Sequence, residues 1–352
     1  MRARILAVGL LVLAGCAPAR ASAGLEFLGQ RQVAFGAEFG GTVVGGLSGI
    51  SYDPAADLYY LISDDRSVRN PARFYTARII LSDNGIDDVQ VVGTRTWQDR
   101  DGQPFGPLDV GAVPPVVPPD PEGIAFDARR QRLYWSSEGE RLVTGAAPVL
   151  LDPWVRAAGL DGGFLGEFAL PDALRMSADG QGARRNSALE GLTLSADGRK
   201  LWAAMEGPGH DDGPPPEEHH GARTRIIRFD VDTGAVDGQY SYPLDAVSAG
   251  PGGDNGLSDL VALDDGSFLV VERGYGTHVA VRIYRASLVD GSAEMTKTLV
   301  ADLGAVVGLA PLDNIEGITL GPRLADGRQS VIAVSDDNFS PTQVTQFLLF
   351  AL

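Results

Sequence analysis

Cysteine, histidine and cationic side chains are scarce in this chain of 352 residues. It holds one cysteine and four histidines, and a single cysteine leaves no partner for an internal disulfide. Acidic residues outnumber lysine and arginine by 46 to 29, which gives a formal net charge of −17. A chain this acidic repels the phosphate backbone, so we expect no nucleic-acid partner.

Several sequence signatures of catalysis are also missing. No G-x-S-x-G elbow surrounds Ser48 or Ser258, and neither a phosphate-binding loop nor a dinucleotide fingerprint occurs. Three histidines lie in the segment 207–221, whose Pro and Gly content indicates a solvated loop more than a zinc site. The chain shows no long amphipathic helical pattern, and its 45 glycines and 22 prolines favour many tight turns over helices.

The first 23 residues carry the pattern of a secretory signal. Arg2 and Arg4 precede an apolar run at 5–13 that is too short to span a bilayer. Two cleavage positions fit: a lipoprotein box that ends at Cys16, and an A-x-A site at 21–23. We favour a lipidated Cys16 because it is the only cysteine. We therefore expect a periplasmic or outer-membrane lipoprotein that contacts the membrane through this lipid alone, with secretion as the alternative.

The rest of the chain, 25–352, is predicted to form one domain, because one pattern recurs five times. In each repeat a Ser or Glu leads a short apolar strand, a turn with Asp or Gly follows, and a second apolar strand ends at an acid. The leading residues are Ser48, Glu122, Glu190, Ser258 and Glu316, and the closing acids are Asp64, Glu138, Glu206, Glu272 and Asp336. In the first three repeats, the number of residues between the leading residue and the closing acid is identical. β-Branched and aromatic residues in these runs, with Asp-Gly turns at 197–198 and 265–266, favour strands.

Hairpins repeated at a steady period indicate a β-propeller or a solenoid. Each repeat exceeds the roughly 40–45 residues of a compact blade, which requires long loops or an extra blade. Two weaker strand candidates follow most hairpins and complete the four strands of a blade. The last repeat lacks a fourth strand, and we expect residues 25–34 to supply it and close the ring. The prediction is an all-β propeller of five blades, with six as the alternative.

The repeated acids are predicted to converge. The innermost strand of each blade lines the central channel, so a leading strand in that place makes Glu122, Glu190 and Glu316 neighbours around the axis. A hairpin returns its second strand to the end where the first began, so the closing acids should lie on the same rim. The alternative is that each acid accepts backbone N–H groups in a turn that the repeat copies.

Carboxylates at close range repel one another unless protons or cations neutralise them. Hard cations with oxygen ligands, Ca²⁺ above all, are the usual partners, and Mg²⁺ and Mn²⁺ are alternatives. The predicted metal ligands are Asp64, Glu122, Glu138, Glu190, Glu206, Asp259, Glu272, Glu316 and Asp336. Arg66 and Arg273 each follow an acid. Such interleaved charge suits a phosphoester, and the alternative is a set of local salt bridges.

Three segments and the chain's ending resemble the bacterial secreted family named for the esterase-like activity of phytase. The segments are Pro121-Glu-Gly-Ile-Ala-Phe-Asp, Leu189-Glu-Gly-Leu-Thr-Leu and Asp313-Asn-Ile-Glu-Gly-Ile-Thr-Leu, and the ending is Ser335-Asp-Asp-Asn-Phe339. The resemblance covers residues 45–352. It implies a phytase-like β-propeller, an exported location and calcium-dependent hydrolysis of phosphate or other esters. It also carries over Glu122, Glu190, Glu316, Asp64 and Asp336 as family-motif positions.

We therefore predict an exported metal-dependent hydrolase of phosphoric esters, a monomer acting on a small-molecule ester. Glu122, Glu190 and Glu316 would hold metal or act as general base, while Arg66 and Arg273 would neutralise developing charge. Because the chain has only two lysines, we expect an ester less charged than phytate. Two alternatives stay open: a non-catalytic, calcium-stabilised propeller that binds an envelope partner, and a lactonase-type hydrolase.

Overall fold

The computed structural model describes residues 24–82, 85–145 and 147–352. The predicted signal segment, with Cys16, lies outside the described residues. Within the described part the chain forms 24 strands and three short 3₁₀ turns, at Asp172–Leu174, His210–Asp212 and Leu303–Ala305. No helix of that part is long and apolar enough to cross a membrane.

The main strands form five four-stranded antiparallel sheets, each of which is described from its innermost strand outward. The first sheet holds β4 (Leu47–Asp53), β5 (Leu58–Ser63), β6 (Arg73–Ser82) and β7 (Gly85–Thr96). The second holds β8 (Pro121–Asp127), β9 (Arg132–Ser137), β12 (Trp154–Ala158) and β13 (Phe164–Glu167). The third holds β14 (Leu189–Leu194), β15 (Lys200–Met205), β16 (Ala222–Asp230) and β17 (Val236–Leu244). The fourth holds β18 (Gly256–Ala262), β19 (Phe268–Gly274), β20 (Ala280–Leu288) and β21 (Met295–Asp302). The fifth holds β22 (Ile315–Arg323), β23 (Gln329–Ser335), β24 (Thr345–Ala351) and β1 (Glu26–Val33).

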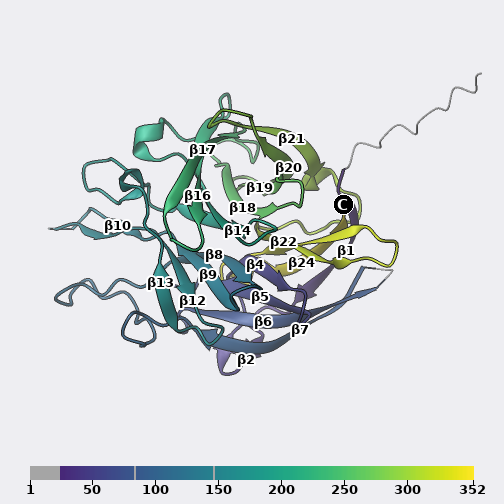
Figure 1. The fold of residues 1–352 in the computed structure, drawn as a ribbon, viewed down its shortest axis with the longest axis horizontal. Coiled ribbons are helices and arrows are strands. Elements are labelled where there is room, and N and C mark those ends of the chain that lie inside the picture. The colour runs from purple at the N-terminus through teal and green to yellow at the C-terminus, as the bar shows by residue number, and fades with distance from the viewer. Residues whose placement is uncertain (1–23, 83–84, 146) are drawn as a thin grey trace, which may run out of the picture.

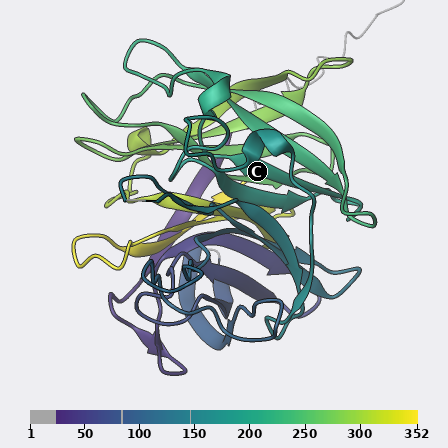
Figure 2. The same ribbon diagram turned by 90° about the vertical axis from the view of Figure 1, so that its left-hand side faces the viewer.

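These sheets are the blades of a five-bladed propeller, as predicted. The inner strands β4, β8, β14, β18 and β22 surround the centre, each beside the next, and β22 returns to β4. Seen from the side, the yellow fifth blade lies between the purple-blue first blade and the green fourth (Figures 1 and 2). Two additional two-stranded sheets lie outside the five blades. One pairs β2 (Glu38–Phe39) with β3 (Thr42–Val43), and the other pairs β10 (Glu140–Leu142) with β11 (Val149–Leu151).

The N-terminal strand closes the ring, as the sequence predicts. β1 pairs antiparallel with β24, with Glu26 opposite Ala351 and Val33 opposite Thr345. The fifth blade is therefore built from both ends of the domain. Unfolding at either end would open a blade and leave sheet edges unpaired.

Both faces of the two inner strands of each blade are buried, which explains why these strands are nearly continuous apolar runs. Side chains of a strand alternate between its two faces. In β5, Leu61 belongs to a hydrophobic cluster that includes Val334 of the fifth blade, whereas Ile62 belongs to a cluster that includes Trp135 of the second blade. A strand that lies between two neighbouring blades has no solvent face, so it carries no polar alternation.

Glycines in the Glu-Gly-Ile motifs let the inner strands approach one another at the axis. A Cβ on Gly123 would lie 2.4 Å from the carbonyl oxygen of Glu190 and 2.7 Å from the Cβ of Leu192 in the next blade. Gly49 and Gly191 occupy the same position in their strands, where a Cβ would also meet backbone atoms of the next blade. The motif therefore reports close packing of blades.

Replacing one of these glycines should destabilise the ring. We expect Gly123→Ala to lower the free energy of unfolding by about 1–3 kcal/mol, because the added methyl overpacks a contact between two backbones. Gly166→Ala is the matched control, since Gly166 lies in an outer strand and a Cβ there would meet nothing within 4 Å. Thermal and denaturant unfolding measure both; equal stabilities would contradict this account.

Candidate metal centre at the mouth of the central channel

A polar cavity of about 560 Å³ opens at the end of the channel where the inner strands begin. Nine carboxyl groups, two guanidinium groups, four amides and one tyrosine line it. The lining residues are Asp64, Arg66, Asp120, Glu122, Glu138, Asn186, Glu190, Glu206, Asp254, Arg273, Tyr275, Asn314, Glu316, Asp336, Asn338 and Gln343. Within this lining no histidine or cysteine occurs, so the available donors are hard oxygen ligands.

The hairpin geometry brings most of the predicted acids together. Glu122, Glu190 and Glu316 occupy the second residue of their inner strands. Each closing acid in this cavity comes directly after the last residue of the second strand of its blade, beside that start. These closing acids are Asp64, Glu138, Glu206 and Asp336.

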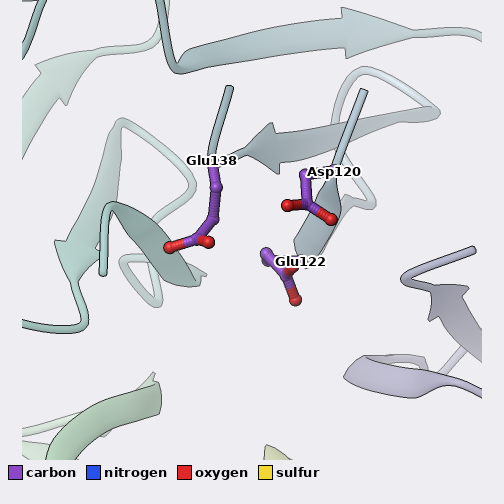
Figure 3. A group of neighbouring side chains, drawn as sticks. All are labelled: Asp120, Glu122 and Glu138. Carbon is purple, nitrogen blue, oxygen red and sulfur yellow. The ribbon is translucent and has the colours of Figure 1, made fainter. Parts of the chain in front are cut away.

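Two groups of three carboxylates stand out. One ligand oxygen from each of Asp120, Glu122 and Glu138 lies within 4.8 Å of the other two, and the three carboxylates face a common space (Figure 3). Glu138, Glu190 and Glu206 form a second group with the same spacing. Because Glu138 belongs to both, the two groups are adjacent. One of its oxygens also accepts the backbone N–H of Ala188, which holds the side chain in place.

Sequence reasoning missed Asp120. Asp120 follows a Pro-rich stretch of the chain, yet its carbonyl accepts the backbone N–H of Glu138 and so continues the hairpin. Asn314 has the same position in the fifth blade, where its carbonyl accepts the N–H of Asp336. The signal was present in the chain: both residues precede the leading Glu by two positions.

Burial and mutual repulsion disfavour charge on these acids. Burial, together with neighbouring carboxylates, raises the pKa of Asp64, Glu122 and Glu190 well above the usual range. Burial also raises the pKa of Asp120 to about 6 although Arg66 opposes the shift. It raises the pKa of Glu206 to about 7 against the opposing charge of Arg273.

A buried oxygen without a partner gives independent evidence for a ligand. Asn314 is only 4% exposed, and its Nδ2 donates to Glu316 Oε1 at 2.8 Å. Its Oδ1 has no hydrogen-bond partner, and an unsatisfied buried acceptor is costly. Amide and carboxylate oxygens together are the ligands that Ca²⁺ prefers. The donor set therefore fits a hard divalent cation.

Both predicted arginines line the cavity, and both are held by carboxylates. Arg273 Nη2 lies 2.9 Å from Glu316 Oε1 and 3.3 Å from Glu206 Oε1. Arg66 Nη1 lies 3.3 Å from Asp120 Oδ2, and its Nη2 pairs with the buried Glu140. Burial lowers the pKa of Arg273, but the carboxylates around it outweigh that effect and raise the pKa above its usual value.

The structure does not bring Glu272 into the cavity. Its carboxylate accepts from Tyr242 Oη at 2.9 Å and from Asn255 Nδ2 at 3.0 Å, and it pairs with Lys297. The hairpin register explains the difference. Glu272 pairs with Leu257 just as Met205 pairs with Leu189. The residue equivalent to Glu206 is therefore Arg273, and the fourth blade contributes a cation where the other four contribute an acid.

Asp259 also lies outside the cavity. It has the position that glycine takes in the other four inner strands. Its carboxylate accepts backbone N–H groups from Leu192, Leu260 and Ile318 at 3.2, 2.8 and 2.8 Å. These residues belong to three successive blades, so Asp259 ties inner strands together, and the turn-like alternative holds for this acid.

Among known proteins, the chain matches one family model and is similar to several solved structures. A family model described as Phytase-like, esterase-like activity of phytase, matches residues 42–339. Among curated proteins no sequence matches significantly. A gluconolactonase from Xanthomonas campestris is similar in structure at 14% identity and a TM-score of 0.40, over 93% of this chain and 95% of that one. A periplasmic gluconolactonase from Pseudomonas aeruginosa is similar at 13% identity and a TM-score of 0.39, over 89% and 90%. Similarity at this level says nothing about the reaction.

Asp259 should matter for stability and not for cation binding. In Asp259→Asn an amide N–H₂ replaces one acceptor oxygen, so one backbone N–H loses its partner, and we expect a loss of about 1–3 kcal/mol. Unfolding curves test this, and calorimetry with Ca²⁺ on the folded variant should give the affinity of the unchanged protein. A tenfold loss of affinity at unchanged stability would return Asp259 to the metal centre.

The metal-free protein should lose stability as the pH rises. A carboxyl whose pKa is higher in the folded than in the unfolded state favours folding while it is protonated, and this contribution is lost as the pH passes the folded pKa. The unfolded pKa of a carboxyl is about 4, and the folded pKa is about 6 for Asp120 and about 7 for Glu206. Tm in chelator should therefore fall between about pH 4 and pH 7. Glu190→Gln, which removes one ionisable group, should show a shallower fall. A flat or rising profile would contradict the charge distribution.

Proposed function

The chain belongs to the phytase-like family, esterase-like activity of phytase, and from this premise and the acidic cavity we propose a hydrolase of ester bonds that depends on a divalent cation. Ca²⁺ is the cation that the oxygen donors favour. The observation that carries the proposal is the convergence of nine carboxyl groups on one cavity, with the unpartnered oxygen of Asn314 among them. A structural role alone would need fewer acids, because each buried carboxylate lowers stability.

The two clusters of three carboxylates are where cations would bind. Asp120, Glu122 and Glu138 would hold one, and Glu138, Glu190 and Glu206 would hold a second beside it. A bound divalent cation orients and polarises the oxygens of an ester and lowers the pKa of a water molecule. Asp64 and Asp336, from the first and fifth blades, complete the acidic wall.

The remaining charged groups have supporting roles in this proposal. Arg66 and Arg273 line the cavity from the first and fourth blades and would stabilise negative charge that develops on the ester. Glu316 accepts from both Arg273 and Asn314 through Oε1. We assign Glu316 to positioning these two side chains and Glu190 and Glu122 to the cations. Glu140, pinned by Arg185, positions Arg66 in the same way.

Removal of the shared acid Glu138, or of Glu190 from the second group, tests the proposal most directly. We expect Glu138→Gln and Glu190→Gln to abolish the rise in Tm that Ca²⁺ causes and to lower turnover of a phosphoester by about 100-fold or more. Asp290→Asn is the control, because Asp290 lies in an exposed turn between β20 and β21. Thermal melting with chelator and with Ca²⁺, alongside hydrolysis of nitrophenyl phosphate, nitrophenyl acetate and a lactone, measures both effects.

The possible outcomes separate the alternatives. Stabilisation by Ca²⁺ with no turnover of any ester would favour a non-catalytic binding propeller. Lactone turnover without phosphatase activity would favour a lactonase-type hydrolase. Absence of any response to Ca²⁺, Mg²⁺ or Mn²⁺ would reject the metal centre.

A further inference from the structure

We propose that the cavity takes an ester of a neutral polyhydroxylated compound, such as a monosaccharide, that carries at most one anionic group. This inference rests on the proposed function and names its substrate class. It comes from the division of the cavity into a buried acidic floor and an exposed rim, where three amides and a tyrosine accompany the single carboxylate of Asp254.

The rim is made of uncharged polar side chains, one aromatic ring and the exposed carboxylate of Asp254. Asn186 and Asn338 are exposed, Gln343 is half-buried, and Tyr275 is 51% exposed, while Glu122 and Glu190 below them are buried. These rim residues come from loops of the third, fourth and fifth blades. A ligand that reaches the acidic floor must therefore pass amides, a phenol ring and one carboxylate.

Amides and an aromatic ring suit a polyol better than they suit an anion. Each amide offers donors and an acceptor, as each neutral hydroxyl does, so the two can pair in either direction. A tyrosine ring offers an apolar face with a polar tip, which can cover the C–H face of a sugar ring. Phosphate oxygens accept only, and several of them would require several donors with positive charge.

Both cationic side chains that line the cavity already form ion pairs with carboxylates. Arg273 is shared among Glu206, Glu316 and Asp254, and Arg66 is shared between Asp120 and Glu140. No lysine lies among the residues that line the cavity. A substrate with several phosphates would meet nine carboxyl groups with no free cationic side chain in this lining, and like charges at this range repel strongly. One anionic group is what the bound cations can balance.

Both asparagines of the rim have a left-handed backbone conformation. Asn186 has φ of 52° and Asn338 has φ of 47°, a left-handed conformation that is uncommon for residues other than glycine. The N–H of Asn338 donates to Asp336 Oδ1 at 2.7 Å, which ties the turn to the acidic floor. Glycine would adopt the same turn more easily, so replacement by glycine removes the amide and keeps the backbone.

Calorimetric titration of the Ca²⁺-loaded protein tests the inference without reference to turnover. The probes are methyl glucoside, glucose 6-phosphate and fructose 1,6-bisphosphate. We expect glucose 6-phosphate to bind more tightly than the bisphosphate, and Tyr275→Ala and Asn338→Gly each to weaken its binding about tenfold, the loss of one good contact. Tyr275→Phe should restore most of the affinity, because it keeps the ring. Gln131→Gly is the matched control: Gln131 has φ of 50° and lies in the turn between β8 and β9, at the opposite end of the hairpin.

Two results would overturn the inference. One is tighter binding of the bisphosphate, and the other is unchanged binding of glucose 6-phosphate in the rim variants. Turnover of nitrophenyl phosphate that depends on Ca²⁺, combined with either result, would leave the proposed function in place and reject the sugar ester. If glucose 6-phosphate binds in a way that depends on the rim but is not hydrolysed, the sugar ligand would be supported and the proposed hydrolase function would be rejected.

Discussion

Repulsion among carboxylates at one end of the central channel is the constraint around which this propeller is organised. A propeller repeats one hairpin around an axis, so any residue placed at the start of the inner strand meets its copies from the other blades. Here those positions carry acids in three of five blades. A ring of aliphatic side chains lies two residues along each inner strand, and it strengthens the repulsion because such surroundings have a low dielectric constant. This ring consists of Ile50, Ile124, Leu192, Leu260 and Ile318.

Departures from the repeat relieve part of that repulsion. Where the first and fourth blades carry serine, Ser48 donates to the carbonyls of Pro121 and Glu122, and Ser258 donates to the carbonyl of Ile315. These hydroxyls clamp neighbouring blades and add no charge. The fourth blade also replaces a closing acid by Arg273 and a motif glycine by Asp259. The most irregular blade is therefore the one that supplies the cation and the inter-blade tie, while the four regular closing positions supply the acids.

Much of this arrangement can be predicted from the chain. The spacing between leading and closing residues predicts the hairpins, and the missing fourth strand of the last repeat predicts closure by the N-terminal strand. Apolar and polar residues do not alternate along β5, which is typical of a strand buried on both faces. The hairpin rule then places Glu122, Glu138, Glu190 and Glu206 on one rim, since a hairpin brings its two ends together. Each of these inferences depends on local geometry that the residue pattern specifies.

The composition of the metal centre depends on register and packing, which the pattern leaves open. Glu272 looks like a closing acid, but a shorter hairpin shifts the equivalent position to Arg273, and one residue of shift moves a side chain to the other face of a strand. Asp259 looks like a ligand, but its carboxylate accepts hydrogen bonds from three backbone N–H groups of separate blades. Asp120 looks like loop, but it faces Glu138 across the hairpin. The residue order decides that acids converge on the axis; only the packed blades decide which of them share a cavity, because partners distant in the chain compete for each carboxylate.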